Sequence, residues 1–398
     1  MSSHVLVLNA GSSSLKYSLV DAETGVAPVS GSVQRIGESR GRLKHSTGNG
    51  SHTSEQEFPT VEKALAGVVD AFATHGPRLQ EADLAAVGHR AVHGGSRFGE
   101  PTLVDDALIE ELRQLVPLAP LHNPANLEGL VVARRLFPDV PQVAVFDTAF
   151  HQTMPPVAYT YAVPLAWREQ HRIRRYGFHG TSYAFVSREA ARLLGKPVAE
   201  TNLIVLHLGN GASAAAIRGG QSVDTSMGFT PLEGLVMGTR SGDLDPAVHA
   251  HLHRQLGWSI DAIDNALNHE SGLKGLAGHN DFREIEALCA QGDEAAQLAF
   301  DVYCYRIRKY VGAYFAVLGT VDAVVFTAGV GQHGTDVRAS CLAGLEALGI
   351  EIDDARNTGR SDGPGVVSTD ASRVQVLVVP TNEEWEIARQ ALAVIRGR

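Results

Sequence analysis

Residues 4–16 read His4-Val5-Leu6-Val7-Leu8-Asn9-Ala10-Gly11-Ser12-Ser13-Ser14-Leu15-Lys16. The apolar run Val5–Leu8 is typical of a buried strand, and the glycine and serines after it predict a turn into a second strand. Backbone N–H groups, hydroxyls, an amide and an ammonium follow one another in this turn, and each can donate a hydrogen bond to a phosphate. A polar hairpin turn explains the same residues without any ligand.

A similar segment returns in the second half of the chain, where Asn202–Ser213 reads NLIVLHLGNGAS. An apolar run again leads into a glycine-asparagine turn and then into small and hydroxyl residues. Elsewhere, strand patterns alternate with long helical patterns, which indicates an α/β fold. We therefore predict two similar α/β domains with a cleft between them. Gly37–Glu57 is rich in polar residues and is expected to be an exposed excursion.

The bulk composition excludes several classes of function. The 398 residues carry a net charge of −10, which argues against a general binder of nucleic acid or of anionic membranes. The three cysteines, Cys289, Cys304 and Cys341, form no CxxC pair, as expected for a reducing compartment. No apolar run is long enough to span a membrane, so we expect a cytoplasmic protein.

Two arginines lie in glycine-rich, otherwise apolar surroundings. Arg90 ends an apolar strand just before Gly94-Gly95, and Arg240 lies in the turn Thr239-Arg240-Ser241-Gly242. Such positions suit bidentate recognition of an anion. The alternative for each arginine is a structural ion pair, for example with Asp243 or Asp245.

Two carboxylates follow apolar strands. Asp147 comes directly after Val143–Phe146, at the strand end that faces the ligand in α/β sheets. Glu383 follows the apolar run Val374–Val379 and begins the last helix. Each could hold Mg²⁺, and Asp147 could act as a base. A helix cap or turn explains Asp147 equally well, and an interaction with the helix dipole explains Glu383.

His179 lies between glycines in Tyr176-Gly177-Phe178-His179-Gly180, where an imidazole could stabilise a transition state. His122, in Leu121-His122-Asn123-Pro124, is a weaker candidate. Gly329–Gly334 reads GVGQHG, which matches the GxGxxG pattern of dinucleotide sites. We interpret it as a glycine loop that approaches a nucleotide. A dehydrogenase is the alternative, but it leaves the two repeated turns unexplained.

Together, these segments resemble the acetate kinase family. The resemblance spans nearly the whole chain in family order and rests on seven motifs: Val7–Lys16, Gly88–Gly95, Pro120–Pro124, Val145–His151, Tyr176–Ser182, His207–Gly211 and Pro380–Glu384. It implies two ribonuclease H-like domains of the actin and Hsp70 type flanking a catalytic cleft. The N-terminal domain would span 1–147, with the helix 384–398 packing back on it. The nucleotide-binding domain would span 148–383. The resemblance also implies a homodimer, which is common in the family.

The resemblance also implies reversible, direct in-line transfer of the γ-phosphoryl group of ATP to acetate, giving acetyl phosphate and ADP. Mg²⁺ is the implied metal, with Mn²⁺ as a substitute. The catalytic group would be Arg90, Asp147, His179 and Arg240, and the metal ligands Asn9 and Glu383. The acetate pocket would comprise Arg90, Val92, Leu121, His122, Phe178 and Pro231. The nucleotide site would comprise Ser12, Ser14, Lys16, His207, Leu208, Gly209, Asn210, Gly211, Asp281, Phe282, Arg283, Gly329, Val330, Gly331, Gln332 and His333.

The chain departs from the family pattern in two places. Gln332 and His333 replace an acid and an amide in the loop near the nucleotide, which puts nucleotide preference in question. Tyr183 stands where a histidine is common, which concerns packing more than chemistry. Acetate is ionised at neutral pH and is already a nucleophile, so Asp147 is expected to position Mg²⁺ or an arginine instead of acting as a base. The alternative functions are a propionate or butyrate kinase and a non-catalytic nucleotide switch.

Overall fold

The computed structural model describes residues 3–79, 82–120, 122–360 and 362–397. The chain divides into two compact units. Unit 1 comprises Met1–Gln152 with Asn382–Arg398, and unit 2 comprises Thr153–Thr381. The domain boundaries expected from the sequence, after residues 147 and 383, stay a prediction. Each unit is built on one mixed β-sheet.

The sheet of unit 1 has eight strands in the order β5-β4-β3-β2-β1-β6-β8-β7. Their bounds are β1 (His4–Ala10), β2 (Ser14–Asp21), β3 (Val29–Gln34), β4 (Gly41–Thr47), β5 (Gly50–Gln56), β6 (Ala86–Ala91), β7 (Thr102–Leu103) and β8 (Gln142–Phe146). Strands β1, β6 and β8 run parallel, so their carboxyl ends meet at one edge of the sheet. That edge carries the residues at the ends of these strands and directly after them.

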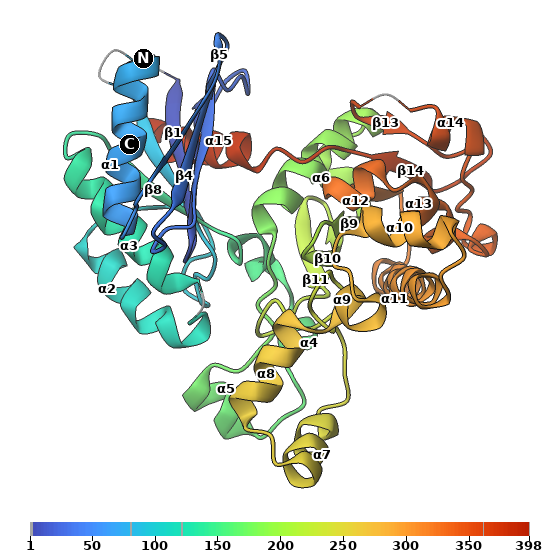
Figure 1. The fold of residues 1–398 in the computed structure, drawn as a ribbon. Helices are drawn as coiled ribbons and strands as arrows, with labels where there is room; N and C mark the ends of the chain where they lie inside the picture. Colours follow the sequence, from blue (N-terminus) through green and yellow to red (C-terminus); the bar gives the residue numbers. More distant parts are fainter. Residues whose placement is uncertain (1–2, 80–81, 121, 361, 398) are drawn as a thin grey trace. The chain divides into compact units, whose positions relative to one another are not determined.

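Helices cover both faces of this sheet, as the alternation along β1 requires. Leu6 and Leu8 pack in a core with α1 (Val61–His75) and α3 (Asn123–Leu136). Val5 and Val7 face the other way and pack against α15 (Glu383–Arg396). Although α15 ends the chain, it therefore lies beside the first strand (Figure 1). Helix α2 (Asp106–Leu115) packs on α3.

The sheet of unit 2 has six strands in the order β11-β10-β9-β12-β14-β13. Their bounds are β9 (Asn202–Leu208), β10 (Ala212–Arg218), β11 (Gln221–Thr225), β12 (Ala323–Thr327), β13 (Gly365–Val366) and β14 (Gln375–Val378). The helices are α4 (Pro156–Tyr159), α5 (Leu165–His171), α6 (Gly180–Leu194), α7 (Ala247–Leu256), α8 (Ile260–His269), α9 (Gly272–Ala277), α10 (Phe282–Ala290), α11 (Glu294–Leu318), α12 (Ala328–His333), α13 (Thr335–Leu342) and α14 (Asp354–Thr358). Helix α6 packs on β9 and β12, and the long α11 packs on β9 and β10.

The two sheets repeat one topology. In unit 1, β3-β2-β1-β6-β8-β7 has the same strand order and the same pattern of parallel and antiparallel pairs as β11-β10-β9-β12-β14-β13 in unit 2. The turn after β1 therefore corresponds to the turn after β9. The predicted repeat is confirmed, and so is the fold class of two α/β units.

One expectation about local structure is confirmed in part and another is wrong. Gly37–Glu57 is largely exposed, as expected, but it contains the paired strands β4 and β5, which the polar composition did not reveal. Alternate residues of β4 are buried against α1, while β5 is exposed throughout. Gly329–Gly334 is not a loop, because most of it forms helix α12. Among the described residues, no helix has the length and apolarity needed to cross a membrane.

Candidate active site

Three charged side chains gather at the carboxyl edge of the unit 1 sheet. Arg90 on β6 donates from Nε to Asp147 Oδ1 at 3.0 Å and from Nη2 to Asp147 Oδ2 at 2.6 Å. Glu383 Oε2, at the start of α15, lies 3.9 Å from Arg90 Nε. Asp147 is almost fully buried, with 2% of its side chain exposed, whereas Arg90 and Glu383 keep about a quarter of theirs accessible. The buried carboxylate thus fixes the plane of the guanidinium.

Electrostatics at this edge favour a bound cation. The charge of Asp147 raises the pKa of Arg90, against the opposing effect of burial. Burial raises the pKa of Glu383 to about 6, and the neighbouring Asp147 adds to this rise while Arg90 opposes it. Two carboxylates facing one guanidinium leave a net negative charge, which an added cation would offset. Mg²⁺ commonly takes only one or two protein carboxylates and completes its shell with phosphates and water, so this donor set fits it.

Asn9 and the first turn lie beside this cluster. Leu8 on β1 pairs with His89 on β6, so the next residues along the two strands, Asn9 and Arg90, are neighbours at the same edge. In the turn, Gly11 N–H donates to Ser14 O at 2.7 Å, and the Ser12 side chain is exposed. Lys16 on β2 pairs with Asn9 and is exposed. The turn leads into a strand, as predicted, and its hydroxyls and the Lys16 ammonium remain accessible.

The acetate-pocket candidates of unit 1 follow the end of β6. Half-buried Val92 donates its backbone N–H to Asn126 Oδ1 at 2.9 Å, and Asn126 Nδ2 donates to Ala10 O at 2.6 Å. Half-buried His122 immediately precedes α3. Leu121 lies outside the described residues. Asn126, which our sequence analysis missed, ties the ends of β1 and β6 together, and nothing in its local sequence signals this role.

In unit 2, His179 and Arg240 reach the same backbone position. A Cβ atom built on Gly211 would lie 3.7 Å from His179 Nε2 and 3.5 Å from Arg240 Nη1. Arg240 Nη1 donates to Pro231 O at 3.2 Å, and burial lowers the Arg240 pKa. No carboxylate of the described residues pairs with it. Asp243 instead accepts from Gly234 N–H and from the Tyr310 hydroxyl, so the alternative interpretation of Arg240, a structural ion pair with Asp243, finds no support in the described part of the chain. A guanidinium desolvated without a counter-ion is a strong site for an anionic ligand.

His179 adopts a left-handed backbone conformation, with φ of 60° and ψ of 22°, at the start of α6. Such a conformation costs free energy for a residue with a side chain, and it places the imidazole where the helix begins. The His179 ring stacks on the His207 ring, with centroids 4.2 Å apart. His207 lies on β9 and contacts Ser182 Oγ through Nδ1 at 2.9 Å. Buried Phe178 precedes His179 in the same segment.

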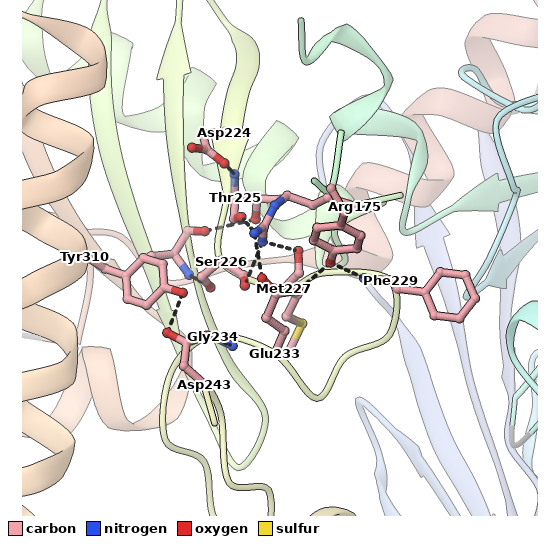
Figure 2. Close-up of polar contacts among 12 residues, drawn as sticks. Arg175, Asp224, Thr225, Ser226, Met227, Phe229, Glu233, Gly234, Asp243 and Tyr310 are labelled. Atoms are coloured by element: carbon pink, nitrogen blue, oxygen red, sulfur yellow. Dashed lines mark hydrogen bonds and ion pairs between the residues drawn. The ribbon is translucent and has the colours of Figure 1, made fainter. Parts of the chain in front are cut away.

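An arginine network holds the two loops that carry these residues. Figure 2 shows Arg175 donating to the carbonyls of Thr225, Ser226 and Met227 and to the Glu233 carboxylate. Arg175 precedes the segment with Phe178 and His179, whereas Glu233 belongs to the loop that carries Pro231 and Arg240. Backbone N–H groups of Tyr176 and Gly177 also donate to Gly228 O. The network therefore joins the His179 segment to the Arg240 loop.

A cavity of about 560 Å³ lies against the turn after β9, which is the size expected for a small-molecule site. Its wall includes Gly209, Asn210, Asp281, Phe282, Arg283, Gly329, Val330 and His333 of the predicted site, together with Gly238, Leu273, Asn280, Glu286, Tyr303 and Gly334. Phe282 packs on Tyr303 with ring centroids 4.9 Å apart. Arg283 forms two hydrogen bonds with the Asp281 carboxylate, which lower the Asp281 pKa to about 2.

Five predicted nucleotide residues of unit 2 are not part of this wall: His207, Leu208, Gly211, Gly331 and Gln332. Gln332 turns its side chain to Asp362 O at 3.3 Å. Gly331 lies on the buried side of α12, close to Phe326. Leu208 is fully buried within β9. The sequence analysis missed Gly238. A Cβ atom at this position would lie only 2.0 Å from Asn210 Oδ1, so the close approach requires a glycine. In the sequence, only its place two residues before Arg240 pointed to a role at the site.

Comparisons with known proteins decide the family. The acetokinase family matches residues 4–389. The acetate kinase of Streptomyces avermitilis is 56% identical over 98% of this chain and 97% of its own length, and that of Leifsonia xyli subsp. xyli is 56% identical over 99% of each. The chain belongs to the acetokinase family.

Solved structures of the acetokinase family agree with the fold. The crystal structure of Porphyromonas gingivalis acetate kinase matches with a TM-score of 0.94 and 42% identity, covering 99% of this chain and all of that one. A propionate kinase from Francisella tularensis subsp. tularensis matches with a TM-score of 0.93 and 40% identity, with the same coverage. Family membership removes the dehydrogenase alternative for the glycines of α12.

Proposed function

We propose that this protein is an acetate kinase, which transfers the γ-phosphoryl group of ATP to acetate and gives acetyl phosphate and ADP. The observation that carries the proposal is the Arg240 guanidinium, which lacks a carboxylate partner within the described residues and meets His179 at Gly211. Gly211 closes the turn whose Gly209 and Asn210 line the 560 Å³ cavity. An anion-binding pair next to a nucleoside-sized cavity is what phosphoryl transfer requires.

The reaction needs alignment and charge neutralisation more than proton transfer. An acetate oxygen forms a bond to the γ-phosphorus while the bond from that phosphorus to the β-bridging oxygen breaks, and no proton moves. Arg240 and His179 donate to the equatorial oxygens of the transferred group. In unit 1, Arg90 binds the carboxylate of acetate. Asp147 orients Arg90 through two hydrogen bonds and does not act as a base.

Asn9 and Glu383 are proposed to hold Mg²⁺ or Mn²⁺, which would offset phosphate charge. The hydroxyls of Ser12 and Ser14 and the Lys16 ammonium are proposed to bind phosphate oxygens, as are His207 and the turn 208–211. The adenosine is assigned to the cavity, against Phe282, Val330 and His333. Val92, Leu121, His122, Phe178 and Pro231 are proposed to bind acetate, as the family resemblance implies. A cytoplasmic location completes the proposal, because the substrate is ATP and all three cysteines are free thiols.

A homodimer is part of the proposal. Within residues 157–167 and 244–260 of unit 2, seven large apolar side chains are at least 42% exposed: Val157, Leu165, Trp167, Leu244, Leu256, Trp258 and Ile260. No residue of α5 or α7 is buried. Exposed apolar surface of this kind marks an interface, and a second copy of the chain is the proposed partner. Mass photometry should find a dimer that Trp258→Asp weakens, whereas a monomeric wild-type protein would reject the proposal.

The activity is tested by trapping acetyl phosphate as its hydroxamate, with ATP, Mg²⁺ and acetate, propionate or butyrate in parallel. We expect a signal with acetate that is larger than the signal with either longer acid. In the same assay, Arg240→Ala should lose all measurable turnover while its circular dichroism matches wild type. Absence of acyl phosphate above background with every acid would reject the kinase proposal and favour a nucleotide switch.

A further inference from the structure

A chain of hydrogen bonds runs beneath His179 on the side away from Gly211. His179 Nδ1 lies 2.8 Å from Ser213 Oγ on β10, and Ser213 Oγ lies 2.5 Å from the hydroxyl of Tyr183. Tyr183 follows His179 by one helical turn of α6, and its N–H donates to His179 O at 3.0 Å. Both Tyr183 and Ser213 are fully buried. The three side chains therefore form a relay from the core of unit 2 to the imidazole.

The residue that begins this relay is a tyrosine, whose hydroxyl can donate as well as accept a hydrogen bond. A tyrosine keeps its proton over the working pH range, and burial raises the pKa of Tyr183 further. Tyr183 therefore places a permanent hydroxyl next to Ser213.

The direction of the relay follows from acidity. A phenol is more acidic than an aliphatic alcohol, so Tyr183 is the better donor and Ser213 Oγ the better acceptor. With Tyr183 donating to Ser213, the single hydrogen of Ser213 points toward His179 Nδ1. Nδ1 then accepts, and the hydrogen of the neutral imidazole resides on Nε2. Nε2 is the atom next to Gly211 and Arg240.

We propose that Tyr183 is a positioning residue that, through Ser213, holds neutral His179 in the tautomer that donates from Nε2 to the transferred phosphoryl group. The inference rests on the proposed function and deepens it. It means that His179 serves as a donor without being protonated a second time. Kinase turnover is then independent of the charge on His179.

Three titratable or charged groups of unit 2 are seen to face His179. The Arg240 guanidinium approaches the same Gly211 position, His207 on β9 stacks on the ring at 4.2 Å, and Tyr183 on α6 contacts it through Ser213. A cation beside an imidazole disfavours a second positive charge. A donor that works without taking up a second proton therefore suits a position next to Arg240.

The test is the pH dependence of kcat for Tyr183→Phe relative to wild type. Without the phenol, Ser213 can accept from His179 Nδ1–H, which leaves Nε2 without a hydrogen while the ring is neutral. At about pH 6, more of the ring is protonated and Nε2 regains its hydrogen. We expect kcat to fall about tenfold at about pH 8.5 and less than about twofold at about pH 6, with KM for ATP and acetate nearly unchanged.

Ser213→Ala breaks the same relay and should show the same pH-dependent loss, and the double variant should lose no more than either single one. If Tyr183→Phe fails to fold, the pH profile of Ser213→Ala alone tests the proposal. Tyr314→Phe is the matched control, because Tyr314 is equally buried on α11 and its hydroxyl has no hydrogen-bond partner among the described residues. The control should follow the wild-type profile.

A loss of kcat by the same factor at every pH, an additive double variant, or no loss at all would overturn the proposal. These results differ from a failure of the proposed function, in which the wild-type protein itself makes no acetyl phosphate.

Discussion

Replacing Asp147 by asparagine should separate positioning from base catalysis. The change leaves the Arg90 guanidinium without the carboxylate that binds it at 2.6 and 3.0 Å, in a place where only 2% of the Asp147 side chain is exposed. Removing one partner of a buried pair costs about 3–5 kcal/mol, because the other charge stays buried. We expect the lower end, about 3 kcal/mol, since Glu383 lies 3.9 Å from Arg90 and offsets part of the loss.

Hydrogen exchange read by mass spectrometry on peptides of β6, β8 and α15 measures this loss within unit 1 alone. Asp106→Asn is the matched control, because it breaks an Arg134–Asp106 pair whose carboxylate is 96% exposed. The control should cost less than about 1 kcal/mol. Turnover of Asp147→Asn should fall about a hundredfold, because a misplaced Arg90 no longer aligns acetate.

Above about pH 7.5, where Glu383 is ionised in both proteins, the ratio of variant to wild-type kcat should not change with pH, since no proton passes through Asp147. A ratio that rose or fell with pH in that range would indicate a base. A stability loss no larger than that of Asp106→Asn would show that Asp147 does not hold Arg90.

Three further predictions concern the acetate pocket, the nucleotide cavity and acid sensitivity. Val92→Ala should raise kcat/KM for propionate relative to acetate by up to about tenfold, the effect of one methylene, and an unchanged ratio would remove Val92 from the pocket. His333→Ala should raise KM for ATP, because His333 lines the cavity. Gln332→Ala should leave KM for ATP unchanged, because the Gln332 side chain turns to Asp362. Equal effects of the two variants on KM would contradict this assignment. His89 is buried on β6, and this burial lowers its pKa to about 4. As pH falls from 6.5 toward 4, the unfolded state takes up a proton at His89 before the folded state does, so the folded protein loses stability. His89→Gln should remove about 2 kcal/mol of the loss between pH 7 and 5 measured by hydrogen exchange, and identical pH dependence in variant and wild type would refute the shift.

Much of the fold followed from local sequence patterns. The apolar runs of β1 and β9 with their glycine turns predicted the repeated sheet topology, because a buried strand and a tight turn leave strong local signals. The hairpin β4–β5 was misjudged because its side chains are mostly polar. Its burial depends on α1, which packs on β4 from a later part of the sequence. Because glycine has a low helix propensity, the glycines of α12 predicted a loop. Helix propensity alone does not predict a helix that is stabilised by packing against neighbouring elements.

Site residues could be predicted where the side chain is charged or titratable and its sequence neighbours are apolar or glycine. Arg90, Asp147, His179 and Arg240 stood out as charged or titratable groups beside apolar runs or glycines. Residues that act through geometry did not stand out. Asn126 bridges the ends of β1 and β6, although it lies 116 residues from Ala10 in the sequence. The contact of Ser213 with His179 and Tyr183 joins β10 to α6, and no pattern within either segment reports it.

The central claim is that an acetate oxygen is the nucleophile and becomes the bridging oxygen of acetyl phosphate when the γ-phosphoryl group is transferred. The protein should be incubated with Mg²⁺, ATP and acetate labelled with ¹⁸O in both oxygens, and the product cleaved by hydroxylamine at its acyl carbon. Mass spectrometry of the released phosphate should find one ¹⁸O atom per phosphate, because the bridging oxygen came from acetate. Released phosphate without ¹⁸O, or no acetyl phosphate at all, would contradict the account.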